Sequence, residues 1–120
     1  MIVGRIRRSV TAGTVIPKPE AEADFVVKAW GRRRGETAPV YSIPNHRNPS
    51  KPYEKGITES EFEKALRELQ NSGEFTRSWF NKHLAACAKE GACNYTTIGG
   101  IFELLGEAQY SSRGVYEQRR

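Results

Sequence analysis

Three consecutive arginines, Arg32, Arg33 and Arg34, form the densest group of side chains in this sequence that can bind a ligand. Glycines flank the three, and the neighbouring segments, residues 25–30 and 38–43, are rich in β-branched and aromatic residues. This pattern predicts a β-hairpin with the arginines at its turn. Because like charges held so close repel one another, the cluster favours an anionic ligand.

The basic charge of the chain is concentrated in its N-terminal half. The 120 residues carry a net charge of +5, and residues 1–56 hold 11 Lys/Arg against 5 Asp/Glu, whereas residues 57–120 hold 8 against 9. Such asymmetry indicates contact with phosphate or with acidic protein, although a solvated surface that binds nothing has the same composition. The further residues of this half that we expect to bind an anion are Arg5, Arg7, Arg8, Arg47 and Lys51.

The sequence contains few residues that could bind a metal or act as a catalytic nucleophile. His83 and Cys87 are four residues apart and share a helix face, as metal ligands can, and Cys93 follows in a loop. No C-x₂-C or H-x₃₋₅-H pair accompanies them, and no third group orients the histidine for a cysteine nucleophile. We therefore interpret the cysteines as small buried residues and expect no catalytic residue, no metal and no cofactor. An enzyme is the less favoured alternative.

The first 56 residues are expected to form the hairpin and its flanks. Residues 1–24 predict a basic arm with short edge strands at Ile2-Val3 and Val15-Ile16, and then a break at Pro17, Pro19, Glu20, Glu22 and Asp24. Pro39 cannot donate to a ladder, so the second hairpin strand is expected to start at an edge. Residues 44–56 contain three prolines and predict a long basic loop. Trp30 either packs across the hairpin or stacks on unpaired bases.

Three helices are predicted to follow. Thr58 and Glu61 form a capping box for a helix that ends near Gly73, and a second helix is expected from Thr76 to Gly91. The third begins between residues 94 and 97 and ends at Gly106. It contains Gly99-Gly100, which costs helix stability and therefore predicts the close approach of another backbone, from a neighbouring helix or a ligand. Residues 107–118 then predict a hairpin with its turn at 111–114. The fold class is α+β, as one domain of residues 1–120.

Three helices followed by a hairpin with Arg-Gly at its turn resemble a winged helix-turn-helix domain, over residues 57–118. The resemblance implies a third helix that faces DNA and a hairpin turn that touches the backbone. It assigns phosphate contacts to Thr96 and Thr97 at the helix start, to Arg113 at the turn, and to the flanking Arg77 and Lys82. The sequence departs from the family in that helix, since residues 96–105 hold no Lys, Arg, Asn or Gln, which make most base contacts.

These observations predict a non-catalytic, regulatory protein that binds nucleic acid phosphates through the basic hairpin. The alternative is a small accessory module, of the kind that phages and mobile elements encode, which docks on an acidic protein surface. No run of 18 apolar residues and no signal-peptide pattern occur, so we expect a cytoplasmic protein with reduced cysteines and no membrane partner.

Overall fold

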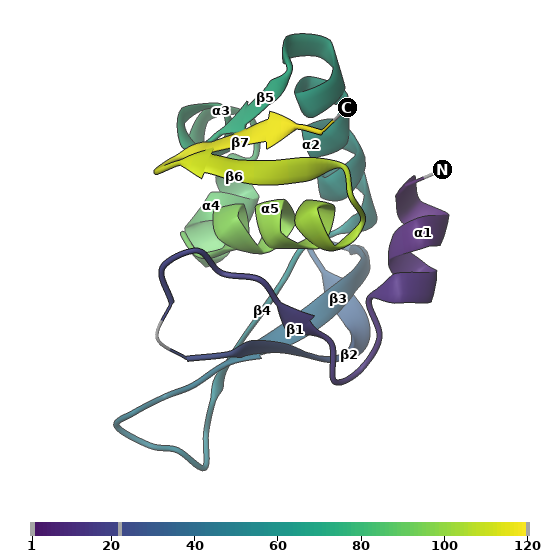
Figure 1. The fold of residues 1–120 in the computed structure, drawn as a ribbon. Helices are drawn as coiled ribbons and strands as arrows, with labels where there is room; N and C mark the ends of the chain where they lie inside the picture. Colours follow the sequence, from purple (N-terminus) through teal and green to yellow (C-terminus); the bar gives the residue numbers. More distant parts are fainter. Residues whose placement is uncertain (1, 22, 120) are drawn as a thin grey trace.

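The chain forms two antiparallel sheets with a helix between them (Figure 1). This computed structural model describes residues 2–21 and 23–119; Met1, Arg120 and Glu22 of the predicted break lie outside the described residues. The α+β class expected from the sequence is confirmed. The longest helix, α2, spans Glu59–Ser72, and α5, Asn94–Leu104, lies between the sheets.

The first sheet has the strand order β1-β2-β3-β4, formed by Val15–Ile16, Phe25–Arg33, Glu36–Ile43 and Tyr53–Gly56. The predicted hairpin is β2–β3, and Arg34 and Gly35 have φ values of 48° and 79°, which suit a two-residue turn with two left-handed positions. The edge strand at Val15–Ile16 is confirmed. Pro39 lies where β3 has only β2 beside it, because β4 pairs with residues 40–43.

Two parts of this half differ from the sequence prediction. Ile2 and Val3, expected in a strand, belong to α1, Ile2–Ser9. The buried Ile2 and Ile6 are four residues apart, and this spacing gives the short helix one apolar face, which contacts α2. Tyr53–Gly56, expected in a loop, forms β4, because the last of the three prolines is Pro52 and every residue after it can donate to the ladder.

The helical half begins as predicted and then departs from the prediction. The capping box of Thr58 and Glu61 starts α2, and Gly73 ends it with φ 82°. The second predicted helix is divided at Leu84 into α3, Arg77–His83, and α4, Ala85–Glu90. No glycine or proline marks this break in the sequence. A short strand, β5, Glu74–Thr76, precedes α3 and was not predicted.

The C-terminal hairpin consists of β6, Ala108–Ser112, and β7, Val115–Gln118, with Gly114 at φ 78° in the turn, as expected. Strand β7 pairs with β6 on one side and with β5 on the other, so the second sheet has the order β5-β7-β6. The strand β5 thereby joins the start of α3 to the hairpin, and the Arg77 N–H donates to Gly114 O at 3.0 Å.

The glycine pair of α5 permits close approach, but the partners are a tyrosine ring and a carbonyl of the chain after β1, and not the neighbouring helix or ligand expected from the sequence. A methyl group added at Gly99 would lie 2.2 Å from the Tyr116 ring, and one at Gly100 would lie 2.3 Å from the Pro17 carbonyl oxygen. The partners are therefore a strand of the second sheet and the chain that leaves β1. Helix α5 is enclosed on both sides, and residues 97–102 are buried.

None of the described helices is long and apolar enough to cross a membrane.

We predict that Gly100→Ala lowers the free energy of unfolding by about 2 kcal/mol or more, because the methyl group meets a backbone carbonyl that cannot move independently. Urea denaturation measures the effect. The matched control is Gly4→Ala in α1, where the nearest atom is the flexible end of Arg8 at 3.3 Å, and where alanine should be neutral or stabilise by up to about 1 kcal/mol. Equal effects of the two substitutions would contradict the enclosure of α5.

Candidate functional site

Two of the three hairpin arginines are neutralised within the chain. Arg34 donates from Nε and Nη2 to the Glu61 carboxylate at 2.7 and 2.8 Å, and from Nη1 to Glu90 at 2.7 Å. Arg33 donates from Nε to Glu90 at 3.0 Å. Of the three hairpin arginines, Arg32 alone is exposed and makes no ion pair with a described residue. The free cationic ridge expected from the sequence is therefore reduced to one side chain.

Arg34 instead connects the first sheet to the helices. Its partner Glu61 also accepts from the Thr58 N–H at 2.8 Å in the capping box of α2, and Arg34 Nη2 donates to Gly56 O at 2.8 Å. The hydrogen bonds with Glu61 raise the pKa of the Arg34 guanidinium further above its ordinary value. Burial favours the neutral form of Glu90, but the hydrogen bonds from both arginines outweigh it and lower the pKa of that carboxyl.

The arginines of the predicted N-terminal arm are also largely paired. Arg7 donates to Glu59 of α2 at 2.6 Å, and Arg5 pairs with Glu107 and donates to the Leu105 carbonyl at 2.6 Å. Arg8 is exposed and makes no ion pair with any residue that the structure describes. Instead of a free arm, α1 is a helix whose charges attach it to α2 and to the segment after α5.

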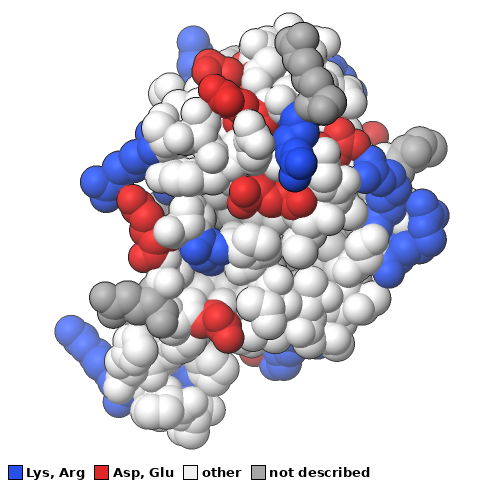
Figure 2. All heavy atoms as spheres, viewed as in Figure 1, with Lys and Arg blue, Asp and Glu red and all other residues white. Residues whose placement is uncertain are grey.

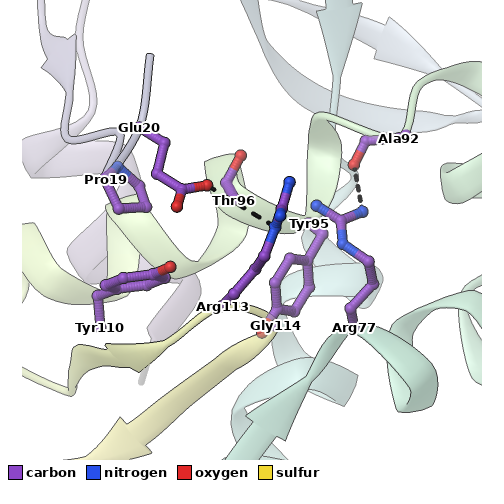
Figure 3. Close-up of a pocket in the computed structure, with 9 residues that line it drawn as sticks. All are labelled: Pro19, Glu20, Arg77, Ala92, Tyr95, Thr96, Tyr110, Arg113 and Gly114. Atoms are coloured by element: carbon purple, nitrogen blue, oxygen red, sulfur yellow. Dashed lines mark hydrogen bonds and ion pairs between the residues drawn. The ribbon is translucent and has the colours of Figure 1, made fainter.

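A pocket of about 400 Å³ brings together three other predicted residues, Arg77, Thr96 and Arg113 (Figure 3). It opens between the β6–β7 turn, the starts of α3 and α5, and the segment after β1. The remaining residues of its lining are Pro19, Glu20, Ala92, Tyr95, Tyr110 and Gly114. Three residues assigned to phosphate by the resemblance to winged helix domains thus share one cavity.

Separate elements place the two guanidinium groups. Arg77 is the first residue of α3, its guanidinium lies over the Tyr95 ring at 4.6 Å, and its Nη1 donates to Ala92 O at 3.0 Å. Arg113 is at the β6–β7 turn with 90% of its side chain exposed. Its ion pair with Glu20 is long, at 4.0 Å, and solvent screens it. The lining therefore holds two arginines and one loosely paired carboxylate, which suits an incoming anion.

Lys18 contacts Thr96 of the pocket lining and was not predicted from the sequence. Its Nζ donates to Thr96 Oγ1 at 2.8 Å, to Thr97 Oγ1 at 2.6 Å and to Cys93 O at 3.1 Å. Burial, with a smaller contribution from the charge of Arg77, lowers the pKa of the Lys18 ammonium to about 7. Thr97 is buried, so the expectation that it faces phosphate is wrong; its hydroxyl accepts from Lys18 inside the protein.

Other predicted residues lie away from the pocket. Lys82 is exposed on α3. Arg47 and Lys51 are exposed on the 44–52 loop, which projects from the first sheet (Figure 1), and neither makes an ion pair with a described residue. Asn45 shapes this loop, since its side chain donates to Lys51 O at 3.1 Å and accepts from the Arg47 N–H at 3.1 Å. Figure 2 shows basic side chains at this protruding end of the molecule.

The remaining candidates have packing roles. Both cysteines are free thiols, and burial raises the pKa of Cys87 well above its ordinary value. His83 stacks on Trp79 with ring centroids 5.1 Å apart. Within residues 2–21 and 23–119, no group of three or more His, Cys, Asp or Glu is placed to hold a metal ion. Trp30 is partly buried against the core and donates from Nε1 to Val10 O at 2.8 Å, outside the hairpin across which it was expected to pack.

Comparison of the chain with protein-family models, with curated proteins and with solved structures gives no match.

We predict that Arg34→Gln lowers the free energy of unfolding by about 1–3 kcal/mol, because Glu61 and Glu90 lose the charge that both of them contact. The matched control is Arg32→Gln in the same hairpin, which should change stability by less than about 0.5 kcal/mol. Urea denaturation at low salt measures both variants. If Arg34→Gln left the free energy of unfolding unchanged, the ion pairs of Arg34 with Glu61 and Glu90 would not stabilise the fold.

We predict that the free energy of unfolding rises between pH 7 and pH 8.5 and that Lys18→Met reduces this rise. The folded chain releases the Lys18 proton near pH 7, whereas the unfolded chain keeps it to about pH 10.4, so raising the pH favours the folded state by up to about 1.4 kcal/mol per pH unit. Urea denaturation at half-unit pH steps gives the slope. Parallel curves for the parent and the variant would exclude a neutral Lys18 in the folded state.

Proposed function

We propose that this protein binds nucleic acid without catalysis and holds a phosphate group in the pocket between Arg77 and Arg113. The convergence of these two guanidinium groups on one cavity carries the proposal. Guanidinium groups present donors in a fixed planar geometry that matches phosphate oxygens. The single carboxylate of the lining, Glu20, contacts Arg113 only at 4.0 Å and is 63% exposed, so an anion can displace it.

The order of the elements supports the proposal. From Glu59 to Gln118 the chain runs through a helix, a strand, three helices and a hairpin, and the strand β5 pairs with β7. This arrangement resembles a winged helix domain with one additional short helix, and in that family the hairpin turn touches the nucleic acid backbone. Arg113 occupies the turn of this hairpin.

The burial of α5 makes this helix unsuited to recognising a base sequence. Tyr116 and Pro17 cover this helix on two sides, and six consecutive residues, 97–102, are buried. Base edges in the major groove are read by exposed polar side chains. The proposal is therefore contact with the phosphate backbone, which carries no direct information on sequence.

The 44–52 loop supplies a second basic surface. In Figure 1 this loop extends from the lower end of the molecule, below the first sheet, and the β6–β7 turn lies at the upper left. Arg47 and Lys51 are exposed there without carboxylate partners among the described residues. Several phosphate contacts of this kind make affinity fall steeply with salt, because bound counterions are released.

We predict that Arg113→Gln weakens binding to labelled oligonucleotides about tenfold and reduces the salt dependence by about one phosphate contact. Its exposed side chain leaves the fold intact, and Arg32→Gln is the matched control with the same loss of charge. Fluorescence anisotropy against single-stranded DNA, RNA and duplex, over a series of salt concentrations, measures the effect.

One further variant and one further ligand extend this binding test. Glu20→Gln removes the competing carboxylate and should tighten binding severalfold. Equal affinity of the Arg113→Gln variant and the parent for every oligonucleotide would overturn the proposal. Tight binding of polyglutamate in place of nucleic acid would assign the pocket to an acidic protein partner.

A further inference from the structure

We infer that the pocket accommodates one unpaired nucleotide, with its phosphate on Arg77 and Arg113 and its base against Tyr110. This inference rests on the proposed function and makes it more specific. It predicts that the protein distinguishes single-stranded nucleic acid from fully paired duplex.

The size of the cavity is the first argument. About 400 Å³ lies in the lower part of the range, roughly 300–1,000 Å³, that small-molecule pockets span. A pocket of this size takes a single nucleotide and excludes a stacked base pair, which stays inside the duplex. The covered helix α5 offers no alternative surface for insertion into a major groove about 12 Å wide.

The placement of charge is the second argument. The stacking of Arg77 on Tyr95 and its hydrogen bond to Ala92 O hold the guanidinium in place before any ligand arrives. Arg113 is free to move, since 90% of its side chain is exposed. A fixed guanidinium and a mobile one can bind the same phosphate from two directions, and the mobile one closes over the bound group.

The aromatic lining is the third argument. Tyr110 extends from β6 into the pocket, and Figure 3 shows it on one side of Arg113 with Tyr95 on the other. The Tyr110 ring packs edge-on against the Tyr116 ring, with centroids 5.5 Å apart and an interplanar angle of 70°. The backbone N–H of Tyr110 donates to Glu103 Oε2 at 3.1 Å. Because every base has a π-face, such a ring accepts an unpaired base irrespective of sequence. Tyr95 has the Arg77 guanidinium over its ring, so Tyr110 is the stacking partner.

The test compares a labelled single-stranded 12-mer with a blunt-ended 12-base-pair duplex, using the full chain and three variants. The parent should bind the single strand at least tenfold more tightly than the duplex. Tyr110→Ala should weaken single-strand binding roughly 5- to 100-fold and leave duplex binding unchanged, whereas Tyr110→Phe should keep the parent affinity. Arg113→Gln should weaken single-strand binding as well.

A competition assay on the parent protein tests the same inference without relying on the fold of the Tyr110→Ala variant. A nucleoside monophosphate should displace the 12-mer from the parent at concentrations where inorganic phosphate of equal ionic strength does not. Equal affinity of the parent for single strand and duplex, or equal competition by the two small anions, overturns this inference while the proposed function stands. Absence of binding to either nucleic acid overturns both.

Discussion

The architecture depends on the enclosure of α5 between the two sheets. Neither Gly99 nor Gly100 leaves room for a methyl group, because the Tyr116 ring and the Pro17 carbonyl lie too close. Contact at Pro17 places the following Lys18, Pro19 and Glu20 along the start of the helix. Contact at Tyr116 places β7, and with it the turn that carries Arg113. Helix α5 thus fixes the positions of the two segments that border the pocket.

Charge is divided between an internal network and an external surface. The hairpin arginines Arg33 and Arg34 contact Glu61 and Glu90, and they link the first sheet to the helices where the chain has carboxylates to receive them. Arg113 and Arg47 have no close carboxylate among the described residues, Glu20 at 4.0 Å excepted. The dense arginine cluster of the β2–β3 hairpin therefore links the first sheet to the helices. The isolated arginines at turns, Arg47 and Arg113, form the surface that is open to an anion.

Local signals in the sequence predicted the β2–β3 hairpin, α2 and the C-terminal hairpin, but not α1, β4, β5 or the break at Leu84. The capping box at Thr58 and the left-handed Gly114 follow from backbone chemistry within a few positions, whereas the partners of Gly99-Gly100 are distant in the sequence. The partners of Arg34 were not predictable, since Glu61 and Glu90 are 27 and 56 residues away along the chain. The same holds for Lys18, which meets Thr97 across 79 residues. Arg77, Thr96 and Arg113 were assigned to phosphate, but the cavity that unites them requires the β5–β7 pairing, and the three-residue β5 is too short to predict.

The assignment of anion binding to the pocket, and not to the arginine hairpin, is the central claim. Nuclear magnetic resonance spectra recorded while a single-stranded oligonucleotide is added test it most directly, because backbone amides and arginine Nε–H groups report contact residue by residue. If the pocket binds the anion, shifts concentrate at Arg77, Tyr95–Thr96 and Tyr110–Gly114, and Arg33 and Arg34 stay unchanged. Shifts centred on residues 32–35 with the pocket unaffected would contradict it.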